Sequence, residues 1–348
     1  MKRTISFRFV IVRDGADYGE IFPATGSAPT VRMMGTGAIK TSLSGNFIDP
    51  GEAVNWLTDE IRPELIIDGI PHSLGIYLPA SVRSEENATT RSLAIEAYDR
   101  CWRVQDGKTE NIMHLDAGSN YLTVIQQLLT SCGIALISKV PTEAVLAEAR
   151  EDWDVGTSYL DIVNQLLSEI NYNPLWFDWD GVAVLELASV PTAANIEHTL
   201  DDTQIQSLLS PSISRETDIY SAPNVFVCVC SNADKDAVMI ARSENTNPQS
   251  PLSIDRRGRR IVSVVKVDNI ADQDELQAFA DRLRNESMIT GETIVVKTGL
   301  FPGYGVNDVT AIRYGDLFAV CLEKAWDMQL KVGGNMTHTL EKVVINLG

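Results

Sequence analysis

The sequence predicts an α+β protein that is mainly β, with a small α/β module between two β-rich regions. Apolar and polar residues alternate with a period of two near both ends of the chain, as half-buried strands require. Two segments in the middle instead repeat apolar residues at helical spacing. At 348 residues, with 44% hydrophobic and 22% charged side chains, the chain is long enough for two or three domains.

The first β-rich region, residues 1–112, is predicted to be a β-domain. Turn signals such as Asp14-Gly15 and Asp68-Gly69 divide it into short apolar segments, a spacing typical of a barrel or a sandwich. In the opening segment Ser6 and Arg8 alternate with apolar residues, which favours a strand over a secretory signal. The candidate strands are residues 5–12, 38–46, 65–67, 75–82 and 92–98.

The middle region, residues 113–200, is predicted to be a small α/β module with a duplicated helix–strand unit. Ser119-Asn120 can cap the first helix, and the second follows Thr157. One duplication predicts a packed module, because repeat arrays need about three copies or more. The aligned helices are residues 119–129 and 157–167, and apolar extended segments follow at residues 134–138 and 175–177.

A hairpin should close the module, because Asp180-Gly181 is a strong two-residue turn signal between apolar runs at 176–179 and 182–187. Residues 192–211 are predicted to be a polar connection.

The last region, residues 201–348, is predicted to be a second β-domain that contains one helix. The apolar face of this helix is Leu276, Phe279, Ala280 and Leu283, and Asp272 or Asp274 can cap it. The candidate strands are residues 224–230, 237–241, 261–267, 293–298, 317–322 and 336–347.

Composition excludes several classes of protein. No apolar run reaches the roughly 18 residues that a membrane-spanning helix needs. The five cysteines are irregularly spaced and include no Cys-x-x-Cys pair, which argues against a zinc site or a disulfide framework and favours synthesis in a reducing compartment. The net charge of −18 repels nucleic acid and anionic lipid. It is explained either by solubility or by a negatively charged surface past which DNA could slide without binding.

Two motifs resemble binding loops but fail in context. The stretch from Gly35 to Thr41 lacks the adjacent Gly-Lys pair of a phosphate loop and leads into a strand, so a loop between strands is the better interpretation. The stretch from Asp178 to Gly181 resembles the start of a calcium loop, but Val182 and its neighbours offer no further oxygen ligands. A hairpin turn explains it better.

No catalytic, cofactor-binding or metal-binding residue is predicted. The four histidines lack metal-ligand spacing and are expected to be surface or strand residues. Signatures of serine, cysteine and metal hydrolases are also missing from the sequence, although a carboxylate pair for glycoside hydrolysis stays open. The histidines are His72, His114, His198 and His338.

Two clusters of side chains have more than one interpretation. Four arginines between Arg256 and Arg260 can pair with acidic groups of this or a neighbouring chain, form a solvated turn, or bind nucleic acid. The aromatic group around Trp153, Trp176 and Trp179 can stack on sugars, but packing in the core of the module is preferred.

The order of these pieces resembles the baseplate hub proteins of contractile-tailed phages and phage-like bacteriocins, the late control D-like tail hub family. The resemblance covers nearly the whole chain, but its motifs are short and degenerate. The matching pieces are IEAYDRCW at residues 95–102, WDVGTSYL at 153–160, FDWDG at 177–181, PNV at 223–225, the helix at 274–283 and Gly315-Asp316.

The resemblance implies a homotrimeric, non-enzymatic adaptor in the tail baseplate of a virion or phage-like particle, assembled in the bacterial cytoplasm. Each chain would contribute two tube-like barrels, so that three chains match a six-fold tail tube to a three-fold spike. Implied partners are the tail tube or tube-initiator protein, the spike protein, and possible contacts with the tape-measure protein and other baseplate proteins. The chain ends near the second barrel, so the spike would be a separate protein; neither membrane nor specific nucleic-acid binding is implied.

Two alternatives stay open. A distal-tail or tube-end protein would share the barrels but form a hexameric ring. A cell-wall carbohydrate-active enzyme would need a carboxylate pair that the sequence does not single out.

Overall fold

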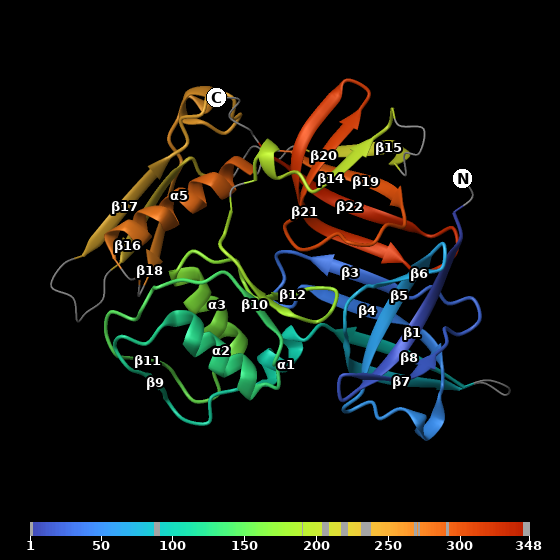
Figure 1. The fold of residues 1–348 in the computed structure, drawn as a ribbon. Coiled ribbons are helices and arrows are strands. Elements are labelled where there is room, and N and C mark those ends of the chain that lie inside the picture. Colours follow the sequence, from blue (N-terminus) through green and yellow to red (C-terminus); the bar gives the residue numbers. More distant parts are fainter. Residues whose placement is uncertain are drawn as a thin grey trace.

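In the computed structural model, a β-rich body lies beside a helical module and a small sheet covered by a helix (Figure 1). Strands make up 46% of the chain and helices 17%, which confirms a mainly β protein with some α structure. The structure describes residues 3–86, 91–189, 191–203, 209–216, 222–230, 238–267, 270, 272–289 and 292–343.

One layer of the body is a four-stranded sheet in the order β2-β1-β5-β6. Its first hairpin turns at Asp14 and Gly15, both with positive φ, as the turn signal predicted. In β5 apolar residues largely alternate with charged ones, and Arg8 of β1 lies on the same face as those charges, so one face packs on the body and the other carries charges. The strands are β1 Ile5–Arg13, β2 Ala16–Ile21, β5 Glu60–Ile67 and β6 Ile70–Ser73, with a 3-10 helix at Gly51–Ala53 before β5.

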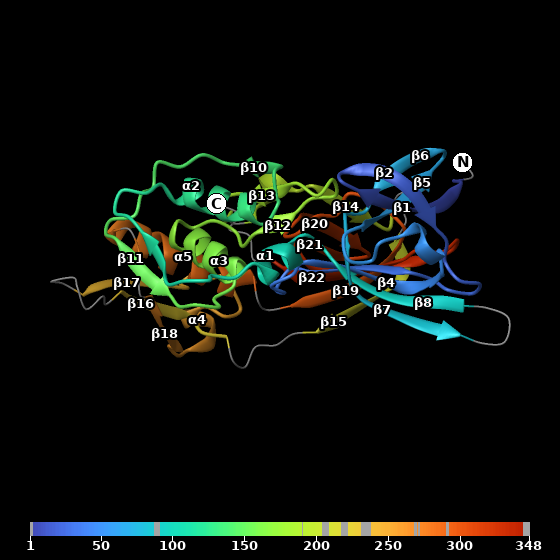
Figure 2. The same ribbon diagram turned by 90° about the horizontal axis from the view of Figure 1, so that it is seen from below.

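The second layer is a long antiparallel sheet in the order β15-β19-β22-β21-β3-β4-β8-β7, with β20 and β14 joined at β21 (Figure 2). The pairing of β21 with β3 links strands from opposite ends of the chain. The strands are β3 Thr30–Met34, β4 Thr41–Ile48, β7 Leu78–Glu86, β8 Arg91–Tyr98, β14 His198–Asp201, β15 Leu209–Glu216, β19 Thr293–Gly299, β20 Val309–Tyr314, β21 Leu317–Gln329 and β22 Asn335–Lys342.

The long sheet consists of two four-stranded units with the same internal order. The first unit is β3-β4-β8-β7 and the second is β15-β19-β22-β21. If the four strands of each unit are numbered in chain order, their order across the sheet is first, second, fourth, third in both units. All neighbours along this path are antiparallel, so corresponding strands of the two units point the same way. The contact between β21 and β3 therefore joins the third strand of one unit to the first strand of the other.

The main apolar core lies between the two layers and uses both ends of the chain. Phe9, Ile61 and Leu65 of the four-stranded sheet pack in the same buried cluster as Trp326 and Met328 of β21. A smaller cluster lies between the C-terminal strands of the long sheet and β14 and β20. Among the described residues no sheet closes into a barrel, so two closed barrels within one chain are not seen.

The middle module follows the sequence prediction. Asn120 accepts a hydrogen bond from the amide of Thr123 at the start of α2, and Ser158 accepts one from the amide of Leu160 at the start of α3. The segments after the two helices, β10 and β12, both pair with β13. The elements are α1 Cys101–Asp106, β9 Met113–Leu115, α2 Tyr121–Ser131, β10 Ile137–Lys139, β11 Arg150–Trp153, α3 Tyr159–Glu169, β12 Trp176–Phe177 and β13 Ala183–Leu185.

A small sheet in the order β17-β16-β18 is inserted between β15 and β19, and α5 covers one of its faces. The predicted apolar face of α5, with Leu276 and Ala280 at its centre, packs against Cys228 and Cys230. Asp272 caps the helix by accepting a hydrogen bond from the amide of Glu275. The elements are β16 Val225–Cys230, β17 Met239–Glu244, α4 Ile254–Arg257, β18 Val262–Val267 and α5 Gln273–Ile289.

The predicted polar connection at residues 192–211 is wrong. This stretch contains a 3-10 helix, Ala193–Asn195, strand β14 and the start of β15. β14 pairs with β20 and β15 with β19 through backbone hydrogen bonds, which their polar sequences do not reveal.

Candidate functional site

The hairpin between β12 and β13 forms the junction between the module and the β body. The carboxylate of Asp178 accepts hydrogen bonds from the amides of Asp180 and Val182, at 3.0 and 2.9 Å, and Gly181 has a φ of 73°. These bonds hold a tight turn, so the motif is a hairpin turn as predicted.

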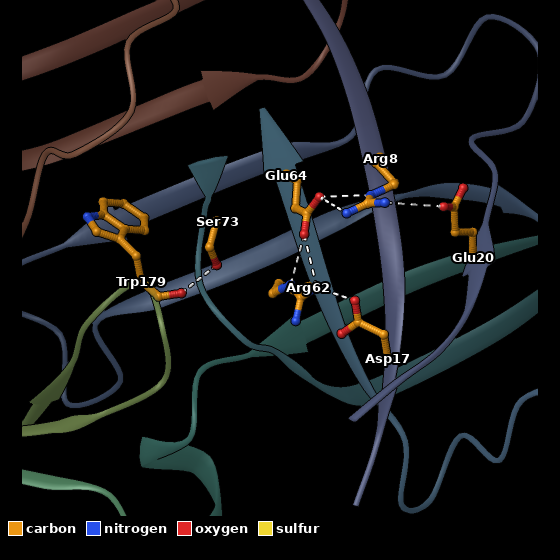
Figure 3. Close-up of polar contacts among 7 residues, drawn as sticks. All are labelled: Arg8, Asp17, Glu20, Arg62, Glu64, Ser73 and Trp179. Carbon is orange, nitrogen blue, oxygen red and sulfur yellow. Dashed lines mark hydrogen bonds and ion pairs between the residues drawn. The ribbon is translucent and has the colours of Figure 1, made fainter. Parts of the chain in front are cut away.

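The tip of this hairpin lies between the two layers of the body. The hydroxyl of Ser73 in β6 donates to the carbonyl of Trp179 at 2.5 Å (Figure 3). The rings of Trp179 and Trp326 lie 5.4 Å apart at a tilt of 31°. One residue of the module thus contacts the N-terminal sheet through its backbone and the C-terminal strands through its side chain.

A buried ion pair fixes the other side of the junction. Arg100 donates to both carboxylate oxygens of Glu60, at 3.0 and 2.8 Å, and to the carbonyl of Gly181 at 2.9 Å. Arg103 approaches the same carboxylate at 3.3 Å. A bidentate arginine has a fixed orientation, so this contact sets the angle of the hairpin against β5.

A ladder of charges crosses the outer face of the four-stranded sheet (Figure 3). Glu64 accepts from Arg8 and from Arg62, at 2.8 and 3.0 Å, and Arg62 also donates to Asp17 at 2.8 Å. Arg8 reaches Glu20 at 3.8 Å. Every member has an opposite charge beside it, so the ladder is a satisfied surface rather than an open binding site.

A buried polar cluster lies among the C-terminal strands. His338, fully buried in β22, makes hydrogen bonds to Glu323 and to Thr298, both at 3.0 Å. Tyr304 packs against His338 and against His198, with ring centroids 4.6 and 3.9 Å apart. The expectation of surface or strand histidines is met, because all four lie in strands.

The protonation of carboxyl groups bears on whether any of them can act as a general acid. Burial raises the pKa of three carboxyl groups, those of Asp99, Glu169 and Glu323. Each is at most 5% exposed and hydrogen-bonded to protein groups. They are therefore out of reach of a polymeric substrate.

A groove of about 1070 Å³ separates α5 from the module and the long sheet. Its described lining contains neither histidine nor cysteine. Two of its carboxylates are held in ion pairs, Glu292 with Lys342 at 3.0 Å and Glu341 with Lys324 at 3.4 Å. Ion pairing lowers the pKa of Glu292, the reverse of what a general acid needs.

The remaining sequence candidates have structural explanations. Lys40 is buried and donates to the carbonyls of Gly35 and Gly37, at 2.8 and 2.7 Å, so the glycine-bearing loop binds its own lysine. Trp153 packs in the core of the module, as preferred, whereas Trp176 and Trp179 pack against the core of the body.

The arginine cluster is partly used within the chain. Arg260 pairs with Glu244, and Arg256 donates to the carbonyl of Pro248 at 3.0 Å. Within the described part of the chain no group of three or more histidine, cysteine, aspartate or glutamate residues can hold a metal ion. In the same described residues, no helix is both long enough and apolar enough to cross a membrane.

A scan against protein-family models and a search of curated proteins gave no match. Solved structures match along almost the entire chain. A tail protein of Neisseria meningitidis is 13% identical, covers 97% of this chain and 96% of its own, and has a TM-score of 0.68. The tail protein of prophage MuSo2 from Shewanella oneidensis is 10% identical, covers 96% and 98%, and has a TM-score of 0.65.

The chain has the fold of phage tail proteins. An E. coli component of the type VI secretion system, described as similar to two tail proteins of bacteriophage T4, also matches. It is 10% identical, covers 98% of this chain and 75% of its own, and has a TM-score of 0.50. At the level of fold, the resemblance found in the sequence is confirmed.

The sequence did not indicate the junction residues Glu60, Ser73 and Arg100, because they lie far apart along the chain. The one usable signal was the aspartate–glycine turn next to tryptophans, which marked a hairpin with a large apolar tip.

Proposed function

We propose that this chain is a structural baseplate hub of a phage-type tail, a trimeric adaptor between a six-fold tail tube and a three-fold spike. The observation that carries the proposal is the repeated unit in the long sheet. Two equivalent units per chain give six units in a trimer, which is how a three-fold object can present six-fold repetition to a tube.

The free edges of the long sheet support closure between chains. β7 and β15 are the outermost strands of the path, and among the described residues neither has a second partner strand. β7 corresponds to β21 and β15 to β3, so pairing of β7 with β15 of the next copy would repeat the antiparallel β21–β3 contact. Repeated three times, this pairing closes a ring and removes the two open ends of the long sheet path in every copy.

The same geometry disfavours the hexameric alternative, because six chains would bring twelve units to the ring. The enzyme alternative is disfavoured because the carboxyl groups with raised pKa are buried. The two predicted barrels become, in this proposal, parts of tubes that close only in the assembly. The proposed domain limits remain residues 1–112, 113–200 and 201–348.

The proposed partners follow from the position of such a ring. Tail-tube or tube-initiator subunits would contact one rim and the spike protein the other, with tape-measure and further baseplate proteins nearby. The proposed location is the tail baseplate of a virion or phage-like particle.

Mass measurement of the purified chain in solution tests the proposal. A mass of three chains is expected, whereas a mass of six chains would favour the tube-end protein and a monomer at all concentrations would contradict both. Cell-wall zymography provides the second arm, and turnover that disappears on replacing one carboxylate would overturn the non-enzymatic assignment.

Proline substitutions test whether β15 is the joint. Successive amides of a strand point to opposite sides. Of the two variants Ile213→Pro and Ser214→Pro, one therefore removes a hydrogen bond to β19, and the other removes an N–H group that points away from β19. The variant that loses the outward group should keep its fold and lose the trimer. If both variants remain trimeric, the joint is elsewhere.

A further inference from the structure

The face of the small sheet that α5 does not cover is apolar and exposed. Ile240, Val262 and Val264 are 58%, 53% and 60% exposed, and they surround Val227 and Val229 of the central strand. Soluble chains rarely leave such a contiguous aliphatic surface in water unless it binds a partner.

Two cations border this face, and one of them, Arg242, lies near Glu244 at the end of β17. Arg242 pairs across the sheet with Val227, and Lys266 with Val229, so each cation lies at one margin of the apolar rows. Both are exposed, and neither forms an ion pair with any residue that the structure describes. Because the whole chain carries a net charge of −18, every other copy of it carries an excess of acidic groups that attract these cations.

The internal joint indicates where the small sheet lies in the assembly. In the first unit, the loop between its first and second strands contacts the third strand of the second unit, because the amide of Gly35 donates to the carbonyl of Lys324 at 2.8 Å. In the second unit, the corresponding connection runs from β15 to β19 and contains the whole small sheet. By this equivalence, the small sheet lies against β7 of the next copy, because β7 is the third strand of the unit that pairs with β15 in the proposed ring.

We propose that the exposed face of β17-β16-β18 packs on the first half of β7 in the neighbouring copy, beside the β15–β7 joint. This inference rests on the proposed ring. In Figure 2, β15, β7 and β18 lie along the lower side of the molecule. A neighbouring copy that pairs with β15 can therefore also contact the small sheet that contains β18.

The surface around the start of β7 fits this role chemically. Ala80 and Ser81 are exposed and small, so an aliphatic face can approach closely. Glu96 of β8 lies opposite Ser81, is exposed, and has no ion-pair partner among the described residues. A free carboxylate beside small side chains complements an apolar face bordered by Arg242 and Lys266.

Val264→Asp tests the proposal, with Val155→Asp as the matched control because Val155 is a valine of similar exposure, 63%, in the helical module. An aspartate that must be desolvated in the contact should weaken trimer formation by roughly tenfold or more. The control should assemble like the wild type. Sedimentation over a range of concentrations measures assembly, and unchanged thermal unfolding shows that both variants fold.

A photo-crosslinking amino acid in place of Lys266 identifies the occupant. A crosslink to the peptide around residues 78–81 of a second copy supports the proposal. A crosslink to a different protein in a phage-producing cell, or to another part of the chain, overturns it.

The two levels of inference fail in different ways. If the wild type is a trimer and Val264→Asp assembles equally well, this contact is wrong and the hub proposal stands. If the wild type has another mass, the trimeric hub is wrong, and Val264→Asp still shows whether the face joins copies. A wild type that stays monomeric overturns both.

Discussion

Replacing Arg100 by methionine should release the hairpin of the module from the β body. Methionine keeps the unbranched stem of the side chain but removes all three donated hydrogen bonds, two to Glu60 and one to the carbonyl of Gly181. The Glu60 carboxylate, with its side chain 5% exposed, then loses its bidentate partner. A carboxylate left alone at this depth is strongly destabilising.

The expected magnitude follows from what remains around Glu60. Removing one partner of a buried pair costs about 3–5 kcal/mol in general. Arg103 stays 3.3 Å from the same carboxylate, and the Arg100 side chain is itself 15% exposed. Both reduce the loss, so we expect the free energy of opening the junction to fall by about 2–3 kcal/mol.

Native-state hydrogen exchange of the amides in residues 176–185 measures this opening, because exchange reports local stability in a chain that need not unfold in one step. Arg103→Met is the control and should cost less than about 1 kcal/mol, as expected for a single longer contact. Equal effects of the two substitutions, or a loss below about 0.5 kcal/mol for Arg100→Met, would refute the bidentate contact as the clamp.

Three further substitutions test other parts of the structure. Gly181→Ala should lower the free energy of unfolding in urea more than Gly258→Ala does. Both glycines have positive φ, but only at Gly181 does an added Cβ meet neighbouring atoms, the nearest at 2.9 Å. Equal losses would mean that backbone strain alone decides. Burial raises the pKa of Glu323, so the wild type loses stability as pH rises through that pKa. The gain in the free energy of unfolding from Glu323→Gln should therefore be larger at pH 8 than at pH 5. A pH-independent difference between the two proteins would contradict this. Hydrogen bonds from Arg13 lower the pKa of Asp59, so that the pair's stabilisation is present above the unfolded pKa and lost as pH falls. Asp59→Asn should therefore cost about 1–2 kcal/mol at neutral pH, and the cost should shrink steadily as the pH falls below the unfolded pKa; an undiminished cost in acid would argue for packing instead.

Periodicity predicted the strands that cover a core on one face. The alternation in residues 5–12 and 224–230 became β1 and β16, and the apolar rows of α2, α3 and α5 became buried faces. In the helices, burial decides which side chains are apolar, so the pattern records the structure, whereas β16 is apolar on both faces.

Edge strands left no such pattern. In β2 only Ile21 is buried, and β15 is mostly polar, since both are held by backbone hydrogen bonds at a sheet margin. The equivalence of the two units was also hidden, because it resides in strand order and direction rather than in side chains.

The buried polar groups were misleading for a related reason. A charged residue in an alternating strand normally indicates the solvent face, yet Glu323 and His338 are both fully buried and are hydrogen-bonded to one another across β21 and β22. Glu60 and Arg100 likewise meet only after β5 and the end of β8 are brought together, so no local spacing identifies the clamp.

The pairing of β21 with β3 also dictates when the molecule can fold during synthesis. The N-terminal strands leave the ribosome with their apolar face uncovered, because Trp326, Met328 and Met336, which complete that core, are translated long after those strands. The helical module, whose contacts are local, can form in the meantime. Such a contact order implies slow folding and a long-lived open intermediate, which cellular chaperones would have to protect until the last strands arrive.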